Sequence, residues 1–179
     1  MHVSKTLYHR LVSRIPAPAA AVTRTVLMTV TAGLMPMAAM ADEDALAAIK
    51  QQFVGHYELV SFISYPATGG EVDNDYVGRI MYDESDQMSA IGMPKSLPER
   101  AAQSSENVRG GFAYWGPVTW DIDNQRVIHH VEGSPTRGSW VGEDNIRFYE
   151  FTVDGLLKLS IRDDAGRTTG TLTWRRIGP

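Results

Sequence analysis

The sequence of 179 residues contains no cysteine. Disulfide bonds and thiolate chemistry are therefore excluded. The sequence also lacks a glycine-rich phosphate loop between a strand and a helix, and Ser134 does not stand in the context of a nucleophile elbow. Nucleotide binding through a phosphate loop and catalysis by a serine nucleophile are thus not indicated.

Acidic residues are absent from the first 41 positions, which hold four basic residues. An apolar run over residues 26–40 follows and ends in Ala39-Met40-Ala41, an order typical of a secretory signal peptide cleaved after Ala41. A mitochondrial presequence is the alternative, because such segments are also arginine-bearing and poor in acidic residues. The run is shorter than the ~18 residues of a membrane-spanning helix, so we expect no stable membrane insertion after cleavage. We predict a signal peptide over residues 1–41 and a periplasmic or secreted protein.

Basic residues are scarce in the 138 residues that follow the leader. The leader holds four of the 17 basic residues and none of the 21 acidic ones, which leaves 13 basic residues and a formal charge of −8. An acidic domain without a basic stripe is a poor candidate for binding nucleic acid or an anionic membrane. Only His56, His129 and His130 follow the leader, without the spacing of metal ligands, so no metal or other cofactor is predicted.

A short helix is predicted over residues 42–52, ahead of the main domain. Its three acidic residues would lie in the first turn, where the helix dipole favours negative charge. Apolar side chains recur at spacings of three and four up to Phe53, enough to dock one face of the helix on a larger body.

From Phe53 onward the apolar spacing changes to two, which is typical of strands. Eight such runs follow one another, mostly with short turns, at residues 57–65, 77–82, 87–92, 112–122, 126–132, 145–151, 156–162 and 168–177. Eight antiparallel strands in one small domain leave unpaired edges unless the sheet closes. We therefore predict an all-β domain over residues 53–179, folded as an eight-stranded antiparallel barrel. Its last strand would lie beside the first, with Leu172–Arg175 opposite Gly55–Tyr57.

Residues 93–111 show no strand pattern. Ser96-Leu97-Pro98-Glu99 combines the spacing of a capping box with a proline at an early helical position, so a short helix is expected there. Long connections in compact domains are often lids or binding loops, and Gly110-Gly111 would serve as the hinge of a lid. A plain surface excursion, or a plug at one barrel end, is the alternative.

Alternation along a strand decides which side chains face the barrel interior. His129 stands between two valines on one face of its strand, and this face is more apolar than the face that carries His130. We therefore place His129 inside, where it would serve as an acid or base near neutral pH or as a hydrogen-bonded interior residue. On the following strand Arg147 shares a face with Tyr149, which predicts that both point inward.

Arginines and aromatic residues complete the candidate site. Arg147 is suited to a two-pronged contact with a carboxylate, and its other expected role is a structural ion pair with Glu132 or Glu143. Arg79, which follows a glycine, has the same two expected roles. The residues expected to supply flat apolar walls with polar tips, or ordinary core packing, are Tyr114, Trp120, Trp140 and Tyr149.

Short segments along the domain form a specific order. They are Gly55-His56-Tyr57, Leu59-Val60-Ser61-Phe62, Val77-Gly78-Arg79-Ile80-Met81-Tyr82, Met88-Ser89-Ala90, Ile128-His129-His130-Val131-Glu132, Pro135, Trp140-Val141-Gly142, Arg147 and Leu172-Thr173-Trp174. In this order they resemble the lipocalin-like family of small bacterial and fungal proteins, from about Phe53 to Ile177. Classical lipocalins open with Gly-x-Trp, whereas Tyr57 stands at the third position here. The resemblance implies a calycin-type barrel with an internal cavity, a fold shared by carriers of small apolar molecules and by some cyclases and isomerases.

An eight-stranded barrel is either filled by its own side chains or roomy enough for one small ligand. We expect an exported, monomeric or weakly dimeric protein that binds a small, mostly apolar molecule, with or without a carboxylate, inside the barrel. The first alternative is an isomerase or cyclase in which His129 moves a proton and Arg147 or Tyr149 holds an oxygen. The second is a filled barrel that serves only as an interaction module. The volume of the interior separates the filled barrel from the other two.

Overall fold

The computed structural model describes residues 37–96 and 110–179. The elements in these ranges are α1 (Met37–Phe53), β1 (Gly55–Ser64), β2 (Val72–Asp73), β3 (Tyr76–Tyr82), β4 (Gln87–Pro94), β5 (Phe112–Asp121), β6 (Arg126–His130), the 3-10 helix η1 (Gly138–Trp140), β7 (Asp144–Phe151), β8 (Leu156–Arg162) and β9 (Thr168–Gly178). The helix expected within the long β4–β5 connection lies outside the described residues. The predicted signal peptide also lies outside them, except for residues 37–41.

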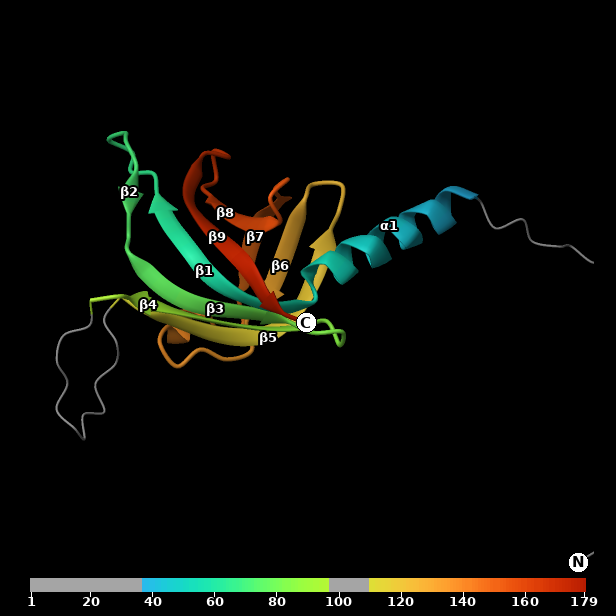
Figure 1. Cartoon of the computed structure of the whole chain (residues 1–179), viewed down its shortest axis with the longest axis horizontal. Coiled ribbons are helices and arrows are strands. Elements are labelled where there is room, and N and C mark those ends of the chain that lie inside the picture. Colours follow the sequence, from blue (N-terminus) through green and yellow to red (C-terminus); the bar gives the residue numbers. More distant parts are fainter. Residues whose placement is uncertain (1–36, 97–109) are drawn as a thin grey trace, which may run out of the picture. The chain divides into compact units, whose positions relative to one another are not determined.

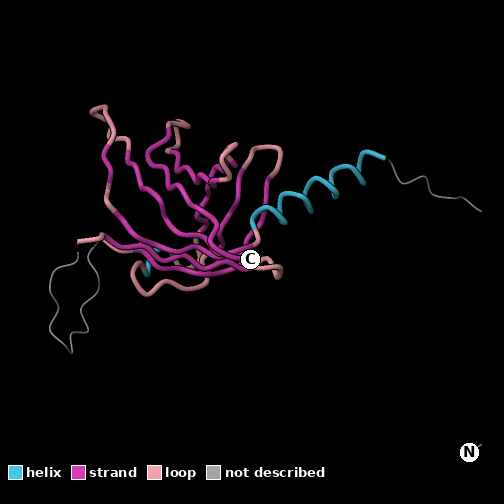
Figure 2. Tube along the Cα trace, viewed as in Figure 1, coloured by secondary structure: helices cyan, strands magenta, loops and turns pink. Residues whose placement is uncertain are grey.

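The strands form one antiparallel sheet that closes on itself. Neighbouring strands follow the order β2-β1-β3-β4-β5-β6-β7-β8-β9, and β1 also pairs with β9. Figure 1 shows β9 beside β1, and Figure 2 shows the mostly short connections between consecutive strands. Closure supplies hydrogen-bond partners to edges that would otherwise be exposed. The eight-stranded antiparallel barrel predicted from the sequence is confirmed.

The additional strand β2 is a two-residue piece that the sequence pattern did not predict. It pairs with the end of β1, on the side where β3 pairs with the beginning of β1. The chain bulges between β2 and β3, where Asp75 has a φ of 50° and the Asn74 side chain donates a hydrogen bond to the Phe62 carbonyl at 2.9 Å. β2 and β3 therefore occupy a single interrupted position in the barrel, which keeps its strand number at eight.

The register of the closing pair differs from the predicted one. Tyr57 lies opposite Arg176, and Trp174 lies opposite Leu59. The prediction was wrong because the β1–β9 pairing contains two register shifts, and each such irregularity changes the offset between the strands. The shift between Leu59 and Ser61 also changes the alternation of β1, because Tyr57 is buried and Phe62 lines the cavity. The Arg176 guanidinium accordingly lies 5.1 Å from the centroid of the Tyr57 ring. Trp174 lies two residues before Arg176 on β9 and lines the barrel cavity.

Helix α1 begins five residues earlier than predicted. Its first turn holds no acidic residue, so the expected placement of the three carboxylates is wrong for the full chain. The reason is an alanine-rich stretch before Asp42, since alanine has the highest helix propensity. At the other end of the helix Phe53 is fully buried and Ile49 packs against the core. No helix among the described residues is long and apolar enough to cross a membrane.

An aromatic cluster around Phe53 fills one end of the barrel, which we call the packed end. The Phe53 ring lies 5.0 Å from Tyr82, 5.9 Å from Trp120, 5.2 Å from Tyr149 and 5.1 Å from Phe151, measured between ring centroids. All four pairs meet edge to face, an arrangement that aromatic quadrupoles favour. The last residue of α1 thus closes the barrel from within.

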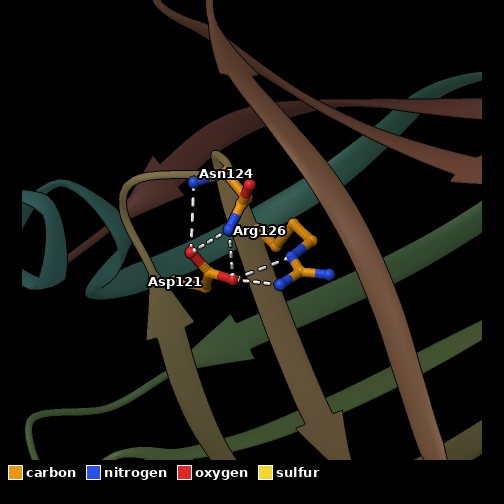
Figure 3. A network of polar contacts seen from close by, with 3 residues as sticks. All are labelled: Asp121, Asn124 and Arg126. Carbon is orange, nitrogen blue, oxygen red and sulfur yellow. Dashed lines mark hydrogen bonds and ion pairs between the residues drawn. The ribbon is translucent and has the colours of Figure 1, made fainter.

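A polar network holds the β5–β6 turn at the packed end (Figure 3). The Asp121 carboxylate accepts hydrogen bonds from Arg126 Nε at 2.9 Å and from the Asn124 backbone N–H at 3.1 Å. Hydrogen bonding from the Arg126 guanidinium is the main reason that the pKa of Asp121 lies below its usual value. The network fixes the hairpin whose two strands carry Tyr114 and His129.

Candidate ligand-binding cavity

The opposite end of the barrel is hollow, and we call it the hollow end. It contains a cavity of about 250 Å³, the liquid volume of roughly eight water molecules. The residues that line it are mostly apolar or aromatic: Phe62, Tyr76, Ile80, Ala90, Gly110, Phe112, Tyr114, Arg137, Trp140, Arg147, Leu159, Ile161, Leu172 and Trp174. Small-molecule sites in proteins have this composition, with a few polar groups among apolar walls.

Aromatic rings from β1, β3 and β5 form one wall of the cavity. Tyr76 stacks on Phe112 with 6.4 Å between ring centroids, and Phe62 meets Tyr76 edge-on at 5.3 Å. The Phe112 ring lies directly over Gly92, because a Cβ built on Gly92 would come within 2.3 Å of it. Glycine at this position therefore lets Phe112 rest against the wall, where it leaves the interior open.

The connection between β6 and β7 covers part of the cavity. It contains η1, and the ring of Trp140 at the end of η1 meets the Tyr114 ring edge-on at 5.4 Å. The Arg137 guanidinium lies 4.8 Å from the Trp140 ring centroid, within the range of a cation–π interaction. This connection therefore brings a flat apolar wall and a positive charge to the cavity.

His129 is buried behind the cavity wall, with 1 % of its surface exposed. Its Nε2 lies 2.9 Å from the Tyr82 hydroxyl and its Nδ1 lies 2.9 Å from the Tyr114 hydroxyl. Of these three residues only Tyr114 lines the cavity. The structure confirms that His129 faces the barrel interior, as its alternation predicts. His129 does not line the cavity itself, and the residue that links it to the cavity is Tyr114.

The chain formed by Tyr82, His129 and Tyr114 is uncharged at neutral pH. Burial lowers the pKa of His129 well below its ordinary value, and the charge of Arg147 lowers it further. Burial also raises the pKa of both tyrosines above the ordinary value. The imidazole is therefore neutral and both hydroxyls keep their protons, so the three groups can exchange hydrogen bonds but do not present a charge.

Arg147 supplies positive charge in the interior. It lines the cavity from β7, and its charge partly offsets the effect of burial on the pKa of Tyr114. Its Nη1 donates a hydrogen bond to the Ile146 carbonyl at 2.9 Å. Among the ion pairs found within residues 37–96 and 110–179, none joins Arg147 to Glu132 or Glu143. The guanidinium is therefore available to a ligand, since it has five N–H donors.

Three of the residues selected from the sequence lie away from the cavity. Trp120 and Tyr149 belong to the aromatic cluster at the packed end. Arg79 is exposed on the outer surface of β3, where its Nη1 lies 3.8 Å from a carboxylate oxygen of Glu58. The structure thus brings together Tyr114, Trp140 and Arg147, with His129 behind them.

Several residues of the barrel interior, in the cavity or behind its wall, were not selected from the sequence. Alternation could have found Trp174, which has the same parity on β9 as Leu172, and Tyr82, which has the same parity on β3 as Ile80. It would also have placed Arg79 on the outer face of β3. Arg137 lies in a connection without periodicity, so no sequence signal indicated that it reaches the cavity.

The described residues hold no group of three or more histidine, aspartate or glutamate side chains placed to bind a metal ion. The polar side chains that line the cavity are instead those of two tyrosines and two arginines, besides two tryptophans. Such groups bind oxygen atoms of a ligand through hydrogen bonds and charge. The chemistry that the cavity offers is therefore recognition of a small molecule with an apolar body.

The fold and the cavity together define a class of proteins, the small antiparallel barrels with an interior that is open to a ligand. Residues 54–177 match the lipocalin-like domain family, and the chain belongs to this family. The match extends over the barrel from the start of β1 into β9, which confirms the resemblance seen in the order of sequence segments. No curated protein matches the sequence.

Proposed function

We propose that this protein is exported and that it binds a small, largely apolar molecule inside its barrel. The observation that carries the proposal is the cavity of about 250 Å³ at the hollow end, with aromatic and aliphatic walls. Burial of an apolar ligand against such walls contributes roughly 25 cal/mol for each Å² removed from water. In this proposal the protein acts as a monomer or weak dimer.

The geometry supports a binding protein better than an isomerase or cyclase in which His129 moves a proton. A general acid or base must lie within hydrogen-bond reach of the proton that it transfers. Both ring nitrogens of His129 are engaged by tyrosine hydroxyls, and the ring does not line the cavity. Tyr149, the other residue considered for such a reaction, belongs to the packed end.

The binding proposal is tested by changing the volume of the cavity without changing its chemistry. Gly92→Ala would push the Phe112 ring away from β4 and into the cavity, because the added Cβ would lie 2.3 Å from that ring. We expect the affinity for an environment-sensitive, uncharged apolar fluorophore such as N-phenyl-1-naphthylamine to fall about tenfold. Unchanged affinity would show that the fluorophore does not occupy this cavity.

A matched control is available on the outer surface. A Cβ on Gly133 would lie 2.1 Å from the Trp115 ring, and Trp115 is 49 % exposed. Gly133→Ala therefore creates the same kind of clash outside the barrel and should leave fluorophore affinity unchanged. Native mass spectrometry of the protein purified from its own host then identifies a bound molecule directly.

Export is tested separately from binding. If the leader is removed after Ala41, the exported protein begins at Asp42, and helix α1 then starts with three acidic residues. Intact-mass measurement of the protein recovered from the periplasm or medium should give the mass of residues 42–179. Recovery of the full chain from the cytosol would contradict export without affecting the binding proposal.

A further inference from the structure

The direction of the hydrogen bonds around His129 follows from the partners that each group has. A neutral imidazole carries one N–H donor and one acceptor nitrogen. One of the two tyrosines therefore donates to the ring, and the other accepts from it. Because Tyr82 and Tyr114 contact different nitrogens, the choice of tautomer decides which hydroxyl proton is left over.

Tyr82 is the tyrosine that has to donate. It is 1 % exposed, and within the described residues His129 Nε2 is the only hydrogen-bond partner of its hydroxyl. A buried hydroxyl proton without an acceptor is costly. This cost is avoided when Tyr82 donates to Nε2, which places the ring proton on Nδ1 and makes Tyr114 an acceptor from His129.

The proton of the Tyr114 hydroxyl is then free to point into the cavity. Tyr114 lines the cavity, and its oxygen already accepts the Nδ1–H of His129, so its own O–H needs another acceptor. Arg147 lines the same cavity close enough to affect the pKa of Tyr114. An O–H donor and a guanidinium are thus directed at one region of the interior.

Other polar groups of the cavity are donors as well. Arg137 adds a second positive charge, and none of the described residues that line the cavity is acidic. In a chain whose formal charge is −4, this is a local excess of positive charge and of donors without acceptors.

We propose that the Tyr114 hydroxyl and the Arg147 guanidinium bind a carboxylate, and that the ligand of this barrel is a small apolar monocarboxylate. The proposal rests on the binding function above and specifies its ligand. A carboxylate supplies only acceptors, and charge-assisted hydrogen bonds from arginine to carboxylate are the strong ones. The apolar body of the acid would lie against Phe62, Phe112 and Trp140.

The head-group preference tests this proposal. Octanoate, octanamide and octylamine share one apolar body, and their affinities can be compared by isothermal titration calorimetry. We expect octanoate to bind at least about tenfold more tightly than octanamide, and octylamine to bind most weakly. Equal affinities for all three would refute the carboxylate site but support the binding function. If none of the three binds, the binding function fails together with the inference.

Two tyrosine variants test whether the Tyr114 hydroxyl is the hydrogen-bond donor to the carboxylate. Tyr114→Phe removes the free O–H, so the affinity for octanoate should fall about tenfold and the preference over octanamide should shrink. Tyr149→Phe is the matched control, because Tyr149 is also a buried tyrosine but lies at the packed end, away from the cavity. Equal losses in the two variants would contradict a special role of Tyr114.

The hydrogen-bond direction has its own measurement. Long-range proton–nitrogen NMR spectra of the wild-type protein should show the His129 ring proton on Nδ1. In Tyr82→Phe, the donor to Nε2 is lost, so Tyr114 can donate to the ring and octanoate affinity should fall although Tyr82 does not line the cavity. A ring proton on Nε2 in the wild type, or wild-type affinity in Tyr82→Phe, would refute the proposed direction.

Discussion

The two ends of the barrel are built from the same strands but differ in the size of the side chains that point inward. Along β4 the interior residues are Met88, Ala90 and then Gly92 toward the hollow end, and along β9 they are Trp174, Leu172 and then Gly170. At the packed end Phe53 and four aromatic residues fill the interior. The inward side chains of these two strands therefore become smaller toward the hollow end, whereas aromatic rings on β1, β3 and β5 remain there as walls of the cavity.

The largest expected effect is the loss of stability when the packed end is opened. Phe53→Ala should lower the free energy of unfolding by about 3–5 kcal/mol, because it removes a fully buried ring and leaves a void among its neighbours. Phe112→Ala, at the hollow end, should cost only about 1 kcal/mol, since the ring already borders empty space. Urea denaturation of both variants measures the two losses. Similar losses would show that the two ends do not differ in packing.

An effect of intermediate size is expected from the dependence of stability on pH. His129 is buried, whereas His130 lies on the outer face with its Nδ1 2.6 Å from Asp144 and its Nε2 3.0 Å from Thr119. Burial lowers the pKa of His129 in the folded state, so below pH ~6.5 the unfolded chain binds a proton that the folded barrel does not. The stability conferred by neutral His129 is fully present above that pH and is lost as the pH falls.

The measurement is the free energy of unfolding between about pH 6.5 and 5, where the slope from one such group approaches about 1.4 kcal/mol per pH unit. His129→Gln should be less stable than the wild type at neutral pH and should have a flatter slope in this window. An unchanged slope in His129→Gln would contradict the assignment of the slope to the buried ring.

The smallest effect is expected in the turns. Asp121→Asn weakens the network with Arg126 and Asn124 at the β5–β6 turn, and Asp163→Asn weakens the pair with Arg167, where Nε lies 3.1 Å from the carboxylate, at the β8–β9 turn. Both should lower the melting temperature slightly. Because the pKa of Asp121 is lowered in the folded state, its contribution is present above about pH 4 and is lost as the pH falls through the folded pKa. A deficit that persists in Asp121→Asn at pH 2–3 would contradict this cause.

Much of the fold could be predicted because alternation survives over most of each strand of the barrel. The period of two located all eight strands, and the parity of His129 and Arg147 gave the correct side of each strand. The same rule, applied to β3, would have excluded Arg79 from the interior. The start of α1, strand β2 and the closing register could not be predicted, because the spacing of apolar residues specifies neither an alanine-rich extension, nor a bulge, nor the offset between two strands.

The sequence by itself determined which residues share a face, since this depends only on the backbone period. The tertiary structure decided which faces meet, at which end, and with what space between them. His129 acquires its role from Tyr82 on β3 and Tyr114 on β5, residues 47 and 15 positions away in the chain. Their convergence depends on barrel closure and on Phe53 occupying one end only, and both are results of packing between segments distant in sequence.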